Sequence, residues 1–171
     1  MSGPAVVLVG PMGVGKTTVG RILADRLGVG FRDTDADVVQ RAGKPVADIF
    51  LDDGEPHFRA LEREAVRTAV DTHAGVLALG GGAVMAPETR ALLTGRPVAF
   101  LEMEVGEAVR RVGLDAPRPL LAINPRQQWR TLMEERRPLY TEVARAVVPT
   151  GGLTPEQVAD DIMDALELRK A

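Results

Sequence analysis

The sequence contains no cysteine and only two histidines, His57 and His73. Without cysteine the protein can form no disulfide bond, no thiolate nucleophile and no cysteine-ligated zinc site. The two histidines do not have the spacing of a metal-ligand pair. Chemistry based on thiols is therefore excluded, and the histidine spacing gives no indication of a metal site.

Long apolar segments and an excess of positive charge are also missing. No segment approaches the roughly 20 apolar residues that a membrane span requires. The net charge of −3 gives no basic field for a nucleic-acid backbone. The N-terminus has no basic stretch before its first apolar run, so it does not resemble a signal peptide. We expect a cytoplasmic protein without membrane or nucleic-acid partners.

The composition is that of an ordinary globular protein. Of the 171 residues, 45% are hydrophobic, 26% are charged and only 4% are aromatic. This length suits one hydrophobic core, so we expect a single domain over residues 1–171 that acts as a monomer. The few aromatic residues leave little material for a platform that stacks bases.

Short apolar runs alternate with helix-like stretches along the chain. The run at 5–9 is followed by helical spacing from Lys16 onward, and further runs occupy 76–79 and 98–101. Helical patterns cover 56–72, 105–112, 127–135 and 155–169, the last beginning with a capping box at Thr154. This alternation predicts an α/β fold with a mostly parallel sheet. The Pro/Gly-rich stretch 113–126 reads as an irregular surface loop and a candidate lid.

One motif dominates the sequence. Residues 10–18, GPMGVGKTT, match G-x-x-x-x-G-K-[ST] between a predicted strand and a predicted helix. In such a P-loop, glycines let successive amides face phosphate oxygens, and the helix N-terminus adds positive potential. Lys16 would reach the β- and γ-phosphates, and Thr17 would offer its hydroxyl to Mg²⁺. The motif predicts binding of a nucleoside triphosphate.

The rest of the chain argues against two common classes of P-loop protein. A signalling GTPase would normally carry an N-K-x-D segment, and none occurs. A large mechanical ATPase needs more chain, and the run 98–101 ends in Glu102 where a Walker-B aspartate would be sought.

Several polar residues are candidates for an acceptor site. Asp33 and Asp35 follow a predicted strand, and alternation in an extended segment would point both to one side. The alternative is a solvated turn that caps the next helix. Gly80–Gly82 follow another strand, which suggests either close approach to a ligand or a flexible turn. Three arginines could also bind an acceptor: Arg59, Arg118 and Arg136. Each of them, taken singly, is equally compatible with an exposed surface position that has no function in binding.

The order and spacing of these pieces resemble shikimate kinases. The matching elements are GPMGVGKTT, DTD at 33–35, DIF…DGE…FR ending at Arg59, LGGGAV at 79–84, RPLL at 118–121 and R-x-P-L-Y at 136–140. They span nearly the whole chain. The resemblance implies a three-layer P-loop kinase fold with a five-stranded parallel sheet, an acceptor-binding segment near 34–62 and a lid near 113–125. It also implies ATP-dependent phosphorylation of the shikimate 3-hydroxyl in the pathway to chorismate and the aromatic amino acids.

The resemblance assigns roles to individual residues. Lys16, Asp35 and Arg118 would be catalytic, with Asp35 accepting or orienting the proton of the hydroxyl. Mg²⁺ would be held by Thr17 and Asp33. The nucleotide would contact Gly13, Val14, Gly15, Lys16, Thr17, Thr18, Arg111, Arg118 and Pro155. Shikimate would contact Asp35, Arg59, Gly80, Gly81, Gly82 and Arg136, with the two arginines on its carboxylate.

Two other readings stay open at this point. Another small P-loop kinase, acting on gluconate or a nucleoside monophosphate, would share the phosphate cradle and differ in its acceptor pocket. From a different class, the chain could be a nucleotide-dependent switch or a silent relative, against which the matched charged residues argue.

Overall fold

The computed structural model of the chain describes residues 3–104, 107–108 and 125–169. Its centre is a parallel sheet of five strands in the order β2-β3-β1-β4-β5. The strands are β1 (Val6–Val9), β2 (Phe31–Asp33), β3 (Val76–Ala78), β4 (Val98–Glu102) and β5 (Ala146–Pro149). The predicted α/β class and the five-stranded parallel sheet are confirmed.

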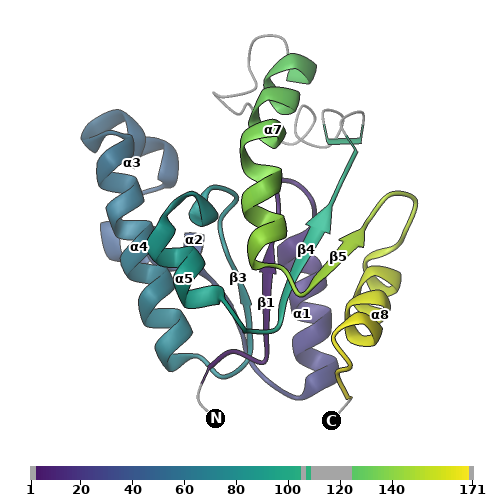
Figure 1. The fold of residues 1–171 in the computed structure, drawn as a ribbon. Coiled ribbons are helices and arrows are strands. Elements are labelled where there is room, and N and C mark those ends of the chain that lie inside the picture. Colours follow the sequence, from purple (N-terminus) through teal and green to yellow (C-terminus); the bar gives the residue numbers. More distant parts are fainter. Residues whose placement is uncertain (1–2, 105–106, 109–124, 170–171) are drawn as a thin grey trace.

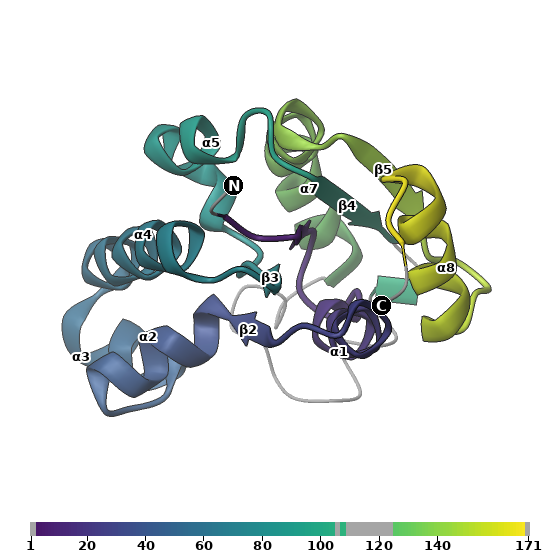
Figure 2. The same ribbon diagram turned by 90° about the horizontal axis from the view of Figure 1, so that it is seen from below.

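Helices cover both faces of this sheet, which explains why its central strands are apolar without alternation. All four side chains of β1 are at most 1% exposed, and those of β3 are also buried. On one face lies α1 (Lys16–Leu27), packed beside α8 (Pro155–Ala165); α5 (Pro87–Leu93) and α7 (Pro125–Val143) lie on the other (Figure 2). The edge strand β5 leaves Val147 46% exposed.

A group of three helices extends the molecule beyond the β2 side of the sheet (Figure 2). It comprises α2 (Thr34–Ala42), α3 (Val46–Asp53) and α4 (Glu55–Thr72). Val38, Ile49, Phe58 and Ala65 form a hydrophobic cluster of their own between these helices, separate from the main core. The predicted acceptor-binding segment 34–62 therefore coincides with a small packed unit attached to the sheet.

Helix α7 is longer than the sequence pattern indicates. The predicted helix 127–135 stops short of Pro138, because proline normally ends a helix. In the structure α7 continues to Val143 with Pro138 inside it. Trp129 and Met133 before the proline and Tyr140 after it are at most 4% exposed. Packing of this continuous face outweighs the local preference of the proline.

The carboxyl ends of the strands meet along one edge of the sheet, at the upper side in Figure 1. There β1 runs into the P-loop, β2 ends at Asp33 and β3 leads to Gly80. Ligands of open α/β sheets bind at this edge. None of the described helices combines the length and apolar character needed to cross a bilayer.

The capping box at the start of α8 allows its contribution to the stability of the protein to be measured. Thr154 accepts a hydrogen bond from the Gln157 amide at 3.2 Å, and the Gln157 side chain accepts one from the Thr154 amide at 2.9 Å. Thr154→Ala should lower the free energy of unfolding by about 1 kcal/mol, measured by urea denaturation, because one helix amide loses its partner. Thr154→Ser, which keeps the hydroxyl, should stay close to wild type. Equal losses in both variants would show that the cap contributes little.

Candidate active site

The P-loop connects β1 to α1 and brings its motif residues together at the sheet edge. Gly15 is the N-cap of α1 with a φ of 99°, a conformation that favours glycine. The Lys16 ammonium donates to the carbonyls of Gly10 at 2.7 Å and Pro11 at 2.9 Å, which places it over the loop. The Lys16 ammonium group is thus held beside the P-loop backbone, whose amides are expected to bind phosphate oxygens.

Thr17 and Asp33 face one another beside this loop. The Thr17 hydroxyl donates to Asp33 Oδ2 at 3.2 Å, while Asp33 Oδ1 accepts from the Asp35 amide at 2.8 Å and caps α2. The same carboxylate therefore caps a helix and turns an oxygen toward the P-loop. Hydroxyl and carboxylate oxygens in this arrangement suit Mg²⁺, which prefers oxygen ligands.

The expectation that Asp33 and Asp35 point to the same side is wrong. It assumed an extended chain, but α2 begins at Thr34, so Asp35 lies in the first helical turn. A Cβ placed on Gly80 would lie 2.5 Å from Asp35 Oδ1. Asp35 thus faces the glycine loop 80–82, whereas Asp33 faces Thr17. The two carboxylates serve different halves of the site.

The loop 80–82 consists of glycines because charged side chains occupy the space beside its backbone. The Cβ placed on Gly80 would also lie 3.0 Å from Glu62 Oε2, and one on Gly82 would lie 2.4 Å from the Arg59 guanidinium. Neither glycine has a positive φ, so lack of space and not backbone conformation requires glycine here. The groups that approach Gly80 and Gly82 most closely are the protein's own side chains, and the expected approach of a ligand to this loop stays a prediction.

Arg59 and Glu62 form an ion pair on α4. Arg59 Nη1 donates to Glu62 Oε1 at 2.8 Å, and Glu62 is only 3% exposed. Burial raises the pKa of Glu62 above its ordinary value of 4.5, while the Arg59 charge opposes the rise and the nearby Asp35 adds to it. Arg59 is therefore a fixed cation beside the glycine loop and not a solvated surface residue.

Arg136 and Arg137 point to different surroundings from adjacent positions of α7. Arg136 is 5% exposed, and its Nη1 lies 3.6 Å from a Cβ placed on Gly81. Arg137 has a side chain that is 48% exposed and forms an ion pair with Glu102 at the end of β4. The helix turns by about 100° per residue, which separates the two guanidinium groups.

Sequence reasoning missed two groups of this site and gave no role to a third. The missed residues are Glu62, which follows Arg59 at helical spacing, and Thr34, whose hydroxyl accepts a hydrogen bond from the Gly80 amide at 3.3 Å. Tyr140 was recognised only as part of R-x-P-L-Y; its hydroxyl donates to the Gly81 carbonyl. An acid three residues after a helical arginine was a signal for Glu62, whereas the other two contacts join distant segments.

The structure does not test the remaining predicted nucleotide contacts. Arg111, Arg118 and nearly all of the candidate lid 113–125 lie outside the described residues. Gly13, Val14 and Thr18 belong to the P-loop and the first turn of α1, and Pro155 is the first residue of α8, which packs beside α1.

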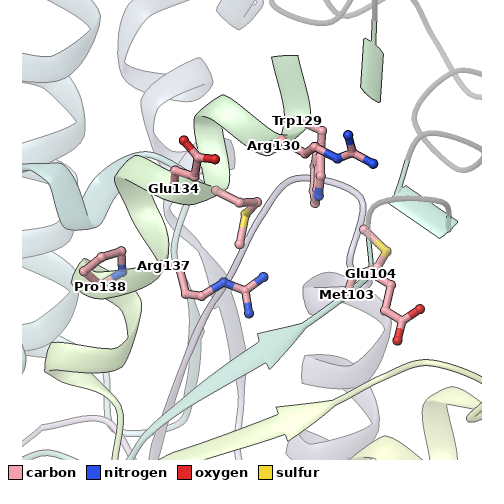
Figure 3. Close-up of a pocket in the computed structure, with 8 residues that line it drawn as sticks. Met103, Glu104, Trp129, Arg130, Glu134, Arg137 and Pro138 are labelled. Atoms are coloured by element: carbon pink, nitrogen blue, oxygen red, sulfur yellow. The ribbon is translucent and has the colours of Figure 1, made fainter. Parts of the chain in front are cut away.

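Two pockets in the described part of the chain lie near these groups. One, of about 440 Å³, is lined in part by Arg59, Glu62 and Gly82. The other, of about 550 Å³, lies between the end of β4 and α7, with Met103 and Trp129 on its wall and Arg137 at its edge (Figure 3). None of the predicted site residues lines the second pocket, so it is not the site that the motifs define.

The parallel sheet, the P-loop with Lys16 and Thr17, and a separate charged acceptor side together define a small P-loop kinase. A family model described as shikimate kinase matches residues 12–167. The chain belongs to the shikimate kinase family. It is 64% identical to the shikimate kinase of Streptomyces avermitilis and 62% identical to that of Streptomyces coelicolor, over 171 residues and the full length of both partners.

A solved structure agrees with this assignment. The shikimate kinase from Acinetobacter baumannii in complex with shikimate superimposes with a TM-score of 0.91 at 37% identity, covering 98% of this chain and 94% of that one.

The ionisation of Glu62 gives a pH-dependent prediction. Because folding raises its pKa, the group's contribution to stability is full below pH 4.5 and is lost as the pH rises through the folded-state pKa. Glu62→Gln removes this titration. The free energy of unfolding of the variant relative to wild type should therefore increase between about pH 4 and pH 7, measured by urea denaturation at constant ionic strength.

Glu64 on the same helix is the control. Its side chain is 45% exposed, and its ion pair with Arg67 lowers its pKa, so Glu64→Gln should show no such increase. A flat or falling difference for Glu62→Gln would contradict the assignment of Glu62 as a carboxyl whose ionisation burial opposes.

Proposed function

We propose that this protein transfers the γ-phosphoryl group of ATP to the 3-hydroxyl of shikimate, giving shikimate 3-phosphate and ADP. Membership of the shikimate kinase family and the A. baumannii structure with shikimate support this substrate pair. The charged groups of the acceptor side support it independently.

The observation that carries the proposal is that Arg136 is a buried cation with one N–H group that has no hydrogen-bond partner among the described residues. Arg136 is 5% exposed, and within the described part of the chain its Nε has no hydrogen-bond partner. A buried guanidinium with an unsatisfied N–H is costly unless a ligand completes it. A carboxylate is the natural complement because it can accept two parallel N–H bonds from arginine. Arg59, beside Gly82, provides a second cation for the same end of the acceptor.

The hydroxylated end of shikimate would lie toward Asp35. In the transfer step the 3-hydroxyl oxygen forms a bond to the γ-phosphorus, and the bond from phosphorus to the bridging oxygen of ADP breaks. The hydroxyl proton passes to Asp35 as the bond forms. A loose transition state requires little deprotonation in advance, so Asp35 serves first to orient the hydroxyl.

Charge on the phosphates would be neutralised from the other half of the site. Lys16, released from the carbonyls of Gly10 and Pro11, would follow the γ-phosphoryl oxygens through the reaction. Thr17 and Asp33 would hold Mg²⁺, which supplies positive charge to the β- and γ-phosphates when bound. Arg118 stays a predicted contributor of a further cation.

A substrate panel tests the proposal directly. Purified protein with ATP and Mg²⁺ should form ADP rapidly with shikimate and only at background rate with gluconate or AMP, measured by a coupled ADP assay. Lys16→Met, which removes the charge and keeps the length of the side chain, should lower kcat/KM by about 100-fold or more. Turnover with gluconate or AMP but not shikimate would replace the proposed acceptor, and tight ATP binding without any turnover would favour a switch.

Arg136 and Arg137 provide a matched pair of variants for the acceptor site. Arg136→Ala should raise the KM for shikimate by about 10- to 150-fold, since a hydrogen bond to a charged group contributes about 1.5–3 kcal/mol. Its KM for ATP should stay within about threefold. Arg137→Ala removes an exposed ion pair and should change either KM little.

Arg136→Lys separates charge from geometry, because lysine keeps the cation but cannot form the bidentate pair. A larger shikimate defect in Arg137→Ala than in Arg136→Ala would show that the acceptor cation has been assigned one residue out of register.

A further inference from the structure

Tyr140 connects two parts of the site through a single hydroxyl. It is 0% exposed on α7, and its ring packs on Phe100 of β4 with centroids 4.8 Å apart. Its hydroxyl reaches beyond the core to donate to the Gly81 carbonyl, 59 residues away in the chain. The ring is therefore anchored in the sheet while the hydroxyl holds the middle residue of the glycine loop.

Gly81 lies where the two halves of the site meet. A Cβ placed on it would lie 3.3 Å from the Met12 amide nitrogen and 3.7 Å from the Gly10 carbonyl, both in the P-loop. The same Cβ would lie 3.6 Å from Arg136 Nη1. A shift of Gly81 thus changes the distance between the acceptor side and the phosphate cradle.

Other hydrogen bonds hold the residues on either side of Gly81. The Gly80 amide is held by Thr34 on α2, and Arg90 donates to the carbonyls of Val84 at 2.8 Å and Met85 at 3.0 Å. These contacts hold the start of the loop and the short turn that follows it. Tyr140 holds the central residue of the loop, Gly81, which borders the P-loop.

We propose that Tyr140 is a positioning residue, which sets the glycine loop against the P-loop so that the acceptor hydroxyl is aligned with the γ-phosphate. This inference rests on the proposed function. Burial raises the pKa of Tyr140 to about 12, while the Arg136 guanidinium opposes the rise, so the hydroxyl remains a donor throughout the working range of the enzyme. Misalignment of reacting groups by a fraction of an ångström lowers the rate of transfer more than it weakens binding.

The test removes the hydroxyl and leaves the ring. Tyr140→Phe keeps the packing on Phe100, so we expect a folded protein whose melting temperature falls by about 2–4 °C. Its kcat with shikimate should fall by about tenfold, while the KM for ATP stays within about twofold. The control is Thr150→Val, which also removes a buried hydroxyl that donates to a carbonyl, that of Glu102 at 2.8 Å, away from the glycine loop. It should lose similar thermal stability and keep kcat within about twofold.

A double-mutant cycle identifies the route of the effect. Gly81→Ala disturbs the same junction from the loop side, so its loss of kcat should overlap with that of Tyr140→Phe and the double variant should lose less than the product of the two. Fully multiplicative losses, an unchanged kcat in Tyr140→Phe, or an equal loss in Thr150→Val would each overturn the positioning role.

The wild-type rate with shikimate is measured in the same assay. If it is zero, the proposed function fails and the inference fails with it; if only the variants disagree, the inference alone fails.

Discussion

The buried charge of Arg136 constrains the whole acceptor side. A guanidinium stays protonated at any pH that the protein meets, and taking it out of water costs several kcal/mol unless opposite charge replaces the solvent. The Glu62 carboxylate supplies such charge, and Glu62 in turn is paired with Arg59 and interacts electrostatically with Asp35. The four groups therefore form one network and not two separate pairs. In the proposed complex an anionic acceptor would add a further carboxylate to this network and give the buried Arg136 Nε a partner.

This network explains the backbone that faces it. Charged side chains from α2 and α4 converge on residues 80–82, and a side chain on Gly80 or Gly82 would occupy the space of Asp35 or Arg59. The loop must also approach the P-loop, because β1 and β3 are neighbours and both end at the same edge of the sheet. Parallel pairing of β1 and β3 thus brings the phosphate cradle and the glycine loop together although they lie far apart in the chain.

The sequence predicted what depends on local pattern. The P-loop and the capping box of α8 follow from spacing that a single helix or turn determines. The roles of Asp33 and Asp35 were assigned to different halves of the site by resemblance, but their geometry was predicted wrongly because D-T-D suits both a strand and a helix N-terminus. Only the contact with Thr17 and the cap on α2 decide between them. Contacts such as Gly80 to Thr34 depend on strand order, which no local pattern encodes.

Pro138 shows how packing overrides such a pattern. A proline inside a helix costs about 3 kcal/mol, since it removes one amide donor and its ring crowds the preceding turn. Burying one large apolar side chain contributes about 1.5–3 kcal/mol, and α7 buries Trp129 and Met133 before the proline and Tyr140 after it. Together these side chains outweigh the penalty, and the helix continues. Arg136 and Tyr140 are thereby held one turn apart on a single helix, which fixes the proposed acceptor cation and the residue that contacts the glycine loop relative to each other.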